Sequence, residues 1–390
     1  MILFLAIGLG ALFYMGGGWY LSGKVQEEAL EAHRLDPADR QGGIVEAAEI
    51  DGSGAGRITL RPDGQNAADT SLDEAVVGIV VGESRVVAGP ATVHADGRRT
   101  REVRDVVGQA PGIGDRYSAD RDVWGTPGEA GLEFEEITVT TPEGEEFPAW
   151  VIPGKGRRNW AVLTHGKGAT RAQMLRMARP LHAAGYNVLI ISHRGDAGAP
   201  RYEEGMVTYG RVEWRELEAA VEYALDRGAT RVLLGGAGHG GAVTLGLLDR
   251  SSVASSIDGV ILDAPASSFE DLIDEAAEDD RLPLVGLPIP ESLEDAAKLL
   301  VAWRYGIAYS EIDYTDMQGL IDVPLLVFQG STDRTVPERV NDRLMDGGAG
   351  DAGDYVVVPG ADHVLSWNLD PEAYEQRITD FVEGLGKAEG

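Results

Sequence analysis

The chain has 390 residues, and its apolar content of 43% is enough for a hydrophobic core, which excludes a disordered protein. The formal net charge of -30 repels phosphate backbones, so we expect no nucleic-acid partner. The chain has no cysteine, which excludes disulfides, a catalytic thiol and thiolate metal ligands.

The first 23 residues carry no charged side chain. A helix of that length, at about 1.5 Å per residue, spans a bilayer of about 30 Å. Trp19 and Tyr20 stand where the aromatic belt of a membrane interface would lie. A cleaved signal peptide is the alternative, but no basic region precedes the apolar run and no A-x-A-like cleavage site follows it. We expect residues 1–23 to be a single-pass transmembrane anchor, with the side of the membrane left open, and residues 24–40 to be a charged stalk.

Short β-branched runs separated by Gly, Asp and Pro recur from residue 41 to 127. They lie at 57–60, 75–81 and 84–87. This pattern is typical of short strands and turns. It predicts a small β-rich domain without a cluster of chemically active side chains.

Strands and helices alternate between residues 128 and 386. Strands are predicted at 132–140, 146–152, 160–164, 187–192, 231–234, 259–262, 323–328 and 354–358, and helices at 171–184, 215–228, 242–249 and 371–385. This alternation predicts an α/β fold, with a mostly parallel sheet covered by helices on both faces. A long helical segment with a Pro-rich middle, about 267–318, falls where a cap over an active site would be inserted.

Two loops at predicted strand ends have the residues of an acyl-transfer site, and such ends are where functional groups collect. The loop His165-Gly166-Lys167-Gly168 is small enough for the amide of Lys167 to serve as an oxyanion donor. The turn at 236–240 fits the G-x-S-x-G elbow, but the nucleophile position is Gly238, which has no attacking atom. The amide of His239 is the second candidate oxyanion donor. A phosphate-binding loop is the competing interpretation, but G-K-[ST] is absent and the glycine spacing does not fit a dinucleotide site.

An acid and a base follow the last two predicted strands. Asp333 comes after strand 323–328, and His363 comes after strand 354–358. The order of position 238, Asp333 and His363 is the order of nucleophile, acid and base in the α/β-hydrolase fold. We predict that Asp333 and His363 are hydrogen-bonded, and that His363 faces Gly238 across a gap that a serine side chain could fill.

Other polar residues near strand ends are expected to be structural. Arg194 and Asp196 should form a local ion pair. Five serines, none of them on the elbow, are expected in turns or helix caps: Ser192, Ser267, Ser268, Ser331 and Ser366. Four histidines lack the paired i, i+4 spacing of a metal site, so we expect neither metal nor cofactor: His165, His193, His239 and His363.

The chain resembles a group of membrane-anchored or exported actinobacterial α/β-fold hydrolases related to serine aminopeptidase-like and esterase-like enzymes. The matching stretches are GRITL (56–60), PAWVIPG (148–154), THGKGATR (164–171), SHRGDAGAPR (192–201), EWRELEAAVEYA (213–224), ILDAP (261–265), GSTDRTVP (330–337) and GADHVLSWNLDP (360–371). The resemblance covers nearly all of the chain after the apolar N-terminus. It implies hydrolysis of a small ester, an amide or a peptide. Members of that family carry G-W-S-x-G-G at the elbow, and this sequence departs from it at Ala237 and Gly238.

The sequence leaves three functions open. The first is a serine-hydrolase relative with little activity. Without the nucleophile, the rate enhancement over the reaction in water is expected to be at most about 10³–10⁴. The second is an enzyme that uses the His363–Asp333 pair as a general base without a covalent intermediate. The third is a non-enzymatic binding protein at a membrane.

Overall fold

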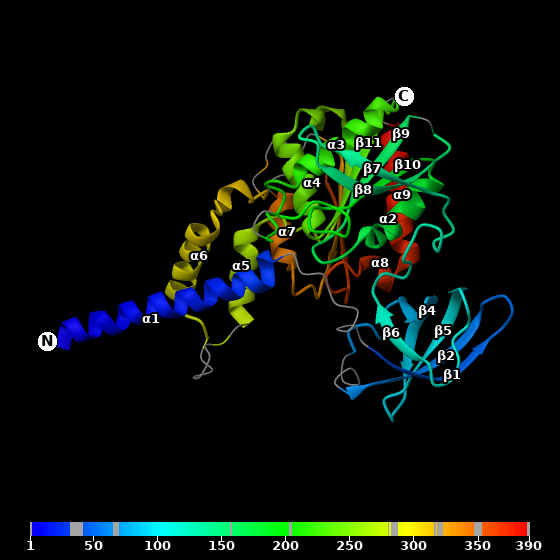
Figure 1. The fold of residues 1–390 in the computed structure, drawn as a ribbon, viewed down its shortest axis with the longest axis horizontal. Coiled ribbons are helices and arrows are strands. Elements are labelled where there is room, and N and C mark those ends of the chain that lie inside the picture. Colours follow the sequence, from blue (N-terminus) through cyan, green and yellow to red (C-terminus); the bar gives the residue numbers. More distant parts are fainter. Residues whose placement is uncertain are drawn as a thin grey trace.

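The computed structural model describes residues 2–31, 42–64, 70–156, 158–202, 205–279, 281, 288–315, 317, 323–346 and 353–387. Most of the predicted stalk and the Pro-rich middle of the predicted cap therefore lie outside the described residues. The described chain forms a long N-terminal helix, a closed barrel and an eight-stranded sheet with helices on both faces (Figure 1).

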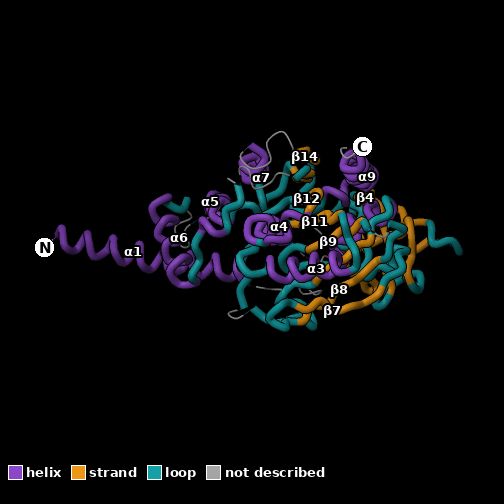
Figure 2. The backbone as a smooth tube through the Cα atoms, turned by 90° about the horizontal axis from the view of Figure 1, so that it is seen from above, coloured by secondary structure: helices purple, strands orange, loops and turns teal. Residues whose placement is uncertain are grey.

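The N-terminal helix α1 (Ile2–Val25) continues into a short π-helix, η1 (Gln26–Leu30). The transmembrane anchor expected from the sequence is not supported, because none of the described helices is long and apolar enough to cross a membrane. The helix α1 instead packs along α6 (Glu291–Tyr305), as Figures 1 and 2 both show. The absence of a side chain at Gly17 lets Leu293 approach closely, with 3.0 Å from the Leu293 side chain to where a Cβ would stand.

The barrel is formed by six antiparallel strands in the order β1-β2-β5-β4-β3-β6. Their bounds are β1 Gly42–Ile50, β2 Gly56–Pro62, β3 Val77–Val81, β4 Ser84–Val93, β5 Arg99–Val107 and β6 Arg116–Asp120. Alternate residues such as Ile58 and Leu60 point into the barrel and are buried. Arg101 is also buried, and its guanidinium donates to the carbonyls of Leu72, Ala75 and Gly89. These bonds replace the water that a buried cation loses.

The sheet has the strand order β14-β13-β12-β11-β9-β10-β8-β7. Its strands are β7 Glu135–Thr140, β8 Glu146–Ile152, β9 Asn159–Thr164, β10 Asn187–Ile191, β11 Arg231–Ala237, β12 Ile257–Asp263, β13 Leu325–Gly330 and β14 Gly353–Val358. Only β8 runs antiparallel to its neighbours β7 and β10, and the other pairings are parallel. The central strands are buried on both faces, which is why they read as continuous apolar runs.

Helices cover the two faces of the sheet (Figure 2). They are α2 Leu175–Ala183, α3 Trp214–Asp226, α4 His239–Arg250, α5 Phe269–Asp279, α7 Glu338–Leu344, α8 Ser366–Leu369 and α9 Pro371–Lys387, with 3₁₀ turns at Arg171–Met174, Ser252–Ser256 and Tyr309–Glu311. Successive side chains of β11 point to opposite faces of the sheet, so they belong to different helix layers. Leu233 belongs to the core under α2 and α9, whereas Leu234 belongs to the core under α3 and α4.

The barrel is joined to the sheet domain through α8. The Asn368 side-chain amide donates to the carbonyls of Val76, at 2.7 Å, and Arg121, at 2.9 Å. The Val76 amide donates in return to the Asn368 carbonyl at 2.8 Å. Beside them the rings of Trp124 and Trp367 meet edge to face, with 5.3 Å between centroids. The barrel therefore rests on the helix that follows the loop of His363.

Candidate functional site

The turn between β11 and α4 has the backbone of a nucleophile elbow. Gly238 lies at its apex with φ 52° and ψ -117°, a conformation that L side chains rarely adopt. Its amide donates to the Asp263 carbonyl at 2.9 Å, and its carbonyl accepts from the Ala266 amide at 3.0 Å. These bonds fix the turn to the end of β12. The sharp geometry is thus present although the residue at the apex is a glycine without a side chain.

Asp333 and His363 lie side by side at the ends of β13 and β14. The Nδ1 atom of His363 is 2.9 Å from Oδ2 of Asp333. The Asp333 side chain is fully buried, and its other oxygen accepts the amides of Thr335 and Val336, each at 2.8 Å. Because an ionised carboxylate can only accept hydrogen bonds, Nδ1 of His363 is the donor to Asp333, and this bond orients the ring.

The imidazole of His363 lies directly over Gly238. A Cβ built on Gly238 would stand 2.9 Å from Nε2 and 3.3 Å from Cε1 of His363. The predicted gap for a serine side chain is therefore wrong, because the ring already fills that space. The His363 side chain is 22% exposed, and the atoms that a Cβ would meet lie at the far end of that side chain.

The predicted oxyanion loop packs against the first turn of α4. A Cβ on Gly240 would stand 2.2 Å from the Thr164 carbonyl oxygen, so only glycine permits this approach. The Gly166 amide is occupied by the side chain of Gln173, at 2.7 Å. Within the described part of the chain, no hydrogen-bond partner is seen for the amides of Lys167 or His239. A cavity of about 30 Å³ borders this loop, enough for about one water or one oxyanion.

The side chain of Lys167 makes contacts that could not be predicted from the sequence. Its ammonium donates to the carbonyls of Glu28 and Ala29, the latter at 3.0 Å, at the end of η1. Burial lowers the pKa of Lys167, although nearby glutamates oppose the shift. Leu30 is buried in the sheet domain, and its carbonyl accepts the amide of Val207 at 2.7 Å. The segment after α1 is thus held beside the oxyanion loop.

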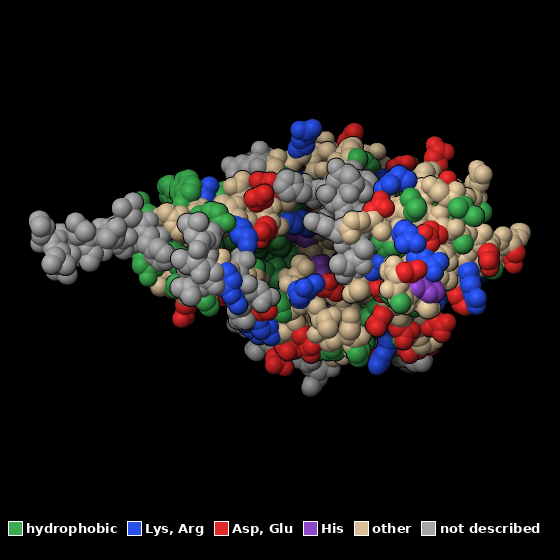
Figure 3. All heavy atoms as spheres, turned by 90° about the horizontal axis from the view of Figure 1, so that it is seen from below, with side chains coloured by type: hydrophobic (Ala, Val, Ile, Leu, Met, Phe, Trp, Pro, Cys, Tyr) green, Lys and Arg blue, Asp and Glu red, His purple; other side chains and the backbone are tan. Residues whose placement is uncertain are grey.

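A cluster of buried histidines lies beside the elbow, and Figure 3 shows histidine side chains inside a hollow of one face. The ring of His193 is edge-on to those of His165 and His239, with centroids 4.6 and 5.5 Å away. Burial and these two neighbours lower the pKa of His193 to about 3, so it stays neutral at pH 7. The Nε2 atom of His239 is 3.4 Å from the buried carboxylate of Glu213. Among the described residues, no group of three candidate ligands could hold a metal ion.

The expected ion pair between Arg194 and Asp196 is wrong. Asp196 instead accepts from Nε2 of His165 at 2.7 Å, and although burial opposes it, this contact lowers the pKa of Asp196 to about 2. Arg194 pairs with the buried Glu216, at 2.8 Å, and with Glu145, at 3.0 Å. Both partners come from other elements, so the chain positions of Arg194 and Asp196 could not reveal them.

Four of the five serines near predicted strand ends have side-chain hydrogen bonds to other parts of the chain. Ser267 donates to Asn341 at 2.8 Å, and Ser366 donates to Asp263 at 3.1 Å. The hydroxyls of Ser331 and Ser268 accept the amides of Gly360 and Asp271, and Ser192 is buried at the end of β10. No hydroxyl of the described residues is hydrogen-bonded to Nε2 of His363.

Asp263 is a further carboxyl group beside the elbow, and it is not among the site residues predicted from the sequence. It is buried at the end of β12 and accepts the hydroxyl of Ser366. Burial raises the pKa of Asp263 to about 6, although Arg176 partly offsets the effect. A carboxyl group at a strand end was the only signal that could have pointed to it.

Comparisons with known proteins agree with this fold. A family model described as "Alpha/beta hydrolase family" matches residues 151–377, more than half of the chain. An esterase from Pyrococcus furiosus aligns in one crystal form with a TM-score of 0.53 and 20% identity, covering 67% of this chain and 95% of that one. Another crystal form gives a TM-score of 0.50 and 22% identity over 67% and 94%. At such identities the likeness shows the fold. No significant match was found among curated proteins.

Proposed function

This chain belongs to the alpha/beta hydrolase family, and on that premise we propose that it is a hydrolase relative with an intact acid–base pair and no nucleophile. Asp333 and His363 are the acid and base, and the amides of Lys167 and His239 are the oxyanion donors. The substrate class of such a site is a small ester, an amide or a peptide. Activity on these substrates is expected to be very low.

The observation that carries the proposal is the contact between His363 and Gly238. In acyl transfer the base takes the proton of the attacking hydroxyl, so base and nucleophile must be in hydrogen-bond reach. Here Nε2 is directed at the Cα of a glycine, a CH₂ group that has no acidic proton for the base to remove and no lone pair to attack with. Oxyanion donors and substrate binding alone leave about 10³–10⁴ of rate enhancement over water.

General-base catalysis without a covalent intermediate is the second candidate. It is supported by the fixed Nδ1–Asp333 hydrogen bond and the partial exposure of the His363 ring. Such a pair can deprotonate a water or an acidic substrate proton. A free water is a poorer nucleophile than a hydroxyl fixed on the elbow, because its position is not held in advance. A binding protein without catalysis is the third candidate.

A fluorophosphonate probe and p-nitrophenyl acetate hydrolysis test the proposal. The variant Gly238→Ser should be labelled and should hydrolyse the ester about 100-fold or more faster than the natural chain. Gly238→Ala displaces the His363 ring in the same way but supplies no hydroxyl, so it should stay unlabelled and slow. The double variant Gly238→Ser/His363→Ala should return to the slow rate.

Other results would favour the alternatives. Labelling of the natural chain would show a different nucleophile and would contradict the proposal. Hydrolysis by the unlabelled natural chain that His363→Ala abolishes would favour the general-base enzyme. A folded but inert Gly238→Ser variant would favour the binding protein.

A further inference from the structure

Both ring nitrogens of His165 face hydrogen-bond acceptors. Nδ1 lies 2.9 Å from the carbonyl oxygen of Gly166, and Nε2 lies 2.7 Å from Oδ2 of Asp196. A carbonyl oxygen can only accept a hydrogen bond. The same Oδ2 atom also accepts the backbone amide of His193, at 3.0 Å, so it is an acceptor as well. A neutral imidazole has one N–H group, whereas these two contacts need two.

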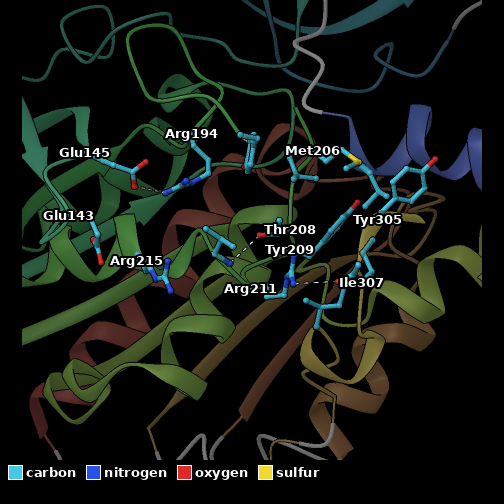
Figure 4. A pocket seen from close by; sticks show the side chains of 16 residues that line it. Glu143, Glu145, Arg194, Met206, Thr208, Tyr209, Arg211, Arg215, Tyr305 and Ile307 are labelled. Atoms are coloured by element: carbon cyan, nitrogen blue, oxygen red, sulfur yellow. Dashed lines mark hydrogen bonds and ion pairs between the residues drawn. The ribbon is translucent and has the colours of Figure 1, made fainter. Parts of the chain in front are cut away.

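The surroundings of His165 favour a positive charge. Its side chain is buried, and although burial lowers the pKa of His165, the contact with Asp196 raises it by more. Arg194 is near Asp196 in the chain but does not neutralise it. Figure 4, a close-up of the neighbouring cavity, shows Arg194 directed at Glu145, and its other ion pair is with Glu216. Within the described part of the chain, His165 is therefore the cation that pairs with Asp196.

The other ionisable groups around His165 do not oppose this charge. His193 lies edge-on to it, and burial, together with the neighbouring histidines, lowers the pKa of His193 to about 3, so it is neutral. His239 faces His193 from α4, on the side away from Asp196. The ammonium of Lys167 is turned to the carbonyls at the end of η1. Asp122, beyond β6, adds to the rise in the pKa of His165.

The hydrogen bond from Nδ1 of His165 also fixes the direction of the next backbone amide. The Gly166 carbonyl and the Lys167 N–H belong to one peptide unit, which is planar and trans, so they point in opposite directions. Since the carbonyl is turned to the His165 ring, the Lys167 N–H points away from that ring. The Ala169 amide donates to the same carbonyl at 3.2 Å, but a donor from a charged ring makes the stronger bond.

We propose that His165 is an imidazolium ion at neutral pH and a positioning residue that directs the Lys167 amide toward the oxyanion. Hydrogen bonds from a charged group are about twice as strong as neutral ones, so the charge strengthens the bond that orients this donor. The positioning role rests on the proposed function, in which the Lys167 amide is an oxyanion donor. The charge of His165 does not depend on that function.

Nuclear magnetic resonance of the natural chain, labelled with ¹⁵N-histidine, tests the charge. At pH 8 an ordinary histidine, with a pKa of about 6.5, is neutral and has one ring N–H. His165 should have two protonated ring nitrogens at this pH, whereas His193 should have one. Each ring is assigned through the backbone amide of its own residue, so no variant is needed. A single protonated nitrogen at His165 would overturn the proposal.

Asp196→Asn tests the source of the charge. Asparagine keeps an acceptor for the His193 amide and for the His165 ring but has no negative charge. His165 should then have one ring N–H at pH 8. The control is Asp354→Asn, an exposed aspartate of β14, which should leave both nitrogens protonated. Two protonated nitrogens in a folded Asp196→Asn variant would contradict the assigned pair.

The residual dipolar coupling of the Lys167 amide reports the direction of its N–H bond, so it tests the positioning role without turnover. The coupling should change in Asp196→Asn and stay the same in Asp354→Asn. The natural chain gives the same test if Asp196→Asn does not fold, because the coupling should change as His165 loses its second proton at alkaline pH. A coupling that ignores the loss of the charge would refute the role.

Turnover in the Gly238→Ser variant gives a second measurement of positioning. Adding Asp196→Asn should lower kcat for p-nitrophenyl acetate about tenfold or more and leave KM unchanged, since the oxyanion forms only on the way to the transition state. An unchanged kcat would contradict the role. If Gly238→Ser is itself inert, the proposed function fails, while the two resonance measurements still decide whether His165 is charged and orients Lys167.

Discussion

The Nε2 atom of His363 lies 2.9 Å from the point where a Cβ on Gly238 would stand. The ring and the missing side chain therefore compete for one volume. Introducing a side chain at position 238 is expected to displace the His363 ring as well as to change the chemistry of the elbow. Stability and activity then report on two different consequences of the same substitution.

Gly238→Ala is expected to lower the free energy of unfolding by about 1–3 kcal/mol, because alanine is strained at φ 52° and its Cβ meets the imidazole. Urea denaturation measures the effect. Gly384→Ala is the matched control, since a Cβ there meets nothing within 4 Å and the residue is exposed in α9. That variant should be neutral or more stable by up to about 1 kcal/mol. Equal effects at the two positions would contradict the strain at the elbow.

Asp333→Asn should lower the esterase rate of the Gly238→Ser variant by about 10²–10⁴. The asparagine does not stabilise a charged imidazole, and its NH₂ group favours the wrong tautomer of His363. Asp354→Asn, an exposed aspartate of β14 paired with Arg377, serves as the control and should leave the rate unchanged. A loss of only a few-fold would show that the Asp333–His363 bond does not orient the base.

Asp263 should make stability depend on pH. Burial raises its pKa from 3.8 to about 6 in the folded protein, so folding favours the protonated carboxyl. Its contribution to stability is fully present below about pH 4 and is lost as the pH rises through 6. Asp263→Asn stays neutral and keeps an acceptor for Ser366. The stability of the natural chain relative to this variant should fall between pH 4 and 6, by roughly 2–3 kcal/mol. A difference that is constant over this range would refute the shift.

Lys167→Met should loosen the segment after α1, because methionine keeps an unbranched apolar side chain, one atom shorter, but cannot donate to Glu28 and Ala29. The amide of Val207, which donates to the Leu30 carbonyl, should then exchange its hydrogen about tenfold faster. Mass spectrometry of the peptide that contains Val207 measures the rate. Lys155→Met, at an exposed position, should leave it unchanged.

The sheet could be predicted because strands that are buried on both faces appear in the sequence as continuous apolar runs. The runs expected at 160–164 and 187–192 correspond to β9 (Asn159–Thr164) and β10 (Asn187–Ile191). The pairing of Asp333 with His363 could also be predicted from their order in the chain and their places after strands. Both inferences rest on local signals combined with a rule that holds for every parallel sheet.

Three barrel strands escaped prediction because their signal is weak without tertiary contacts. The strand β5 reads RTREVRDVV, and its charges hide its alternation. Arg101 is nevertheless buried, since three carbonyls from two other segments, the turn before β3 and the strand β4, accept its hydrogen bonds. The docking of Leu30 and the pairing of His165 with Asp196 likewise depend on residues distant in the chain.

Through the contacts of Asn368, the barrel supports the loop that carries His363. Val364, directly after His363, is a β-branched residue held at φ 52°. Its carbonyl accepts from Arg176, which also donates to the Asn368 side chain and pairs with Asp122 beyond β6. The backbone conformation at Val364, which turns the imidazole toward the elbow, is thus held by hydrogen bonds that reach the barrel through Arg176. If the sheet domain were transferred to another protein without the barrel, Val364 would lose these contacts. The two parts should therefore be kept together in protein engineering.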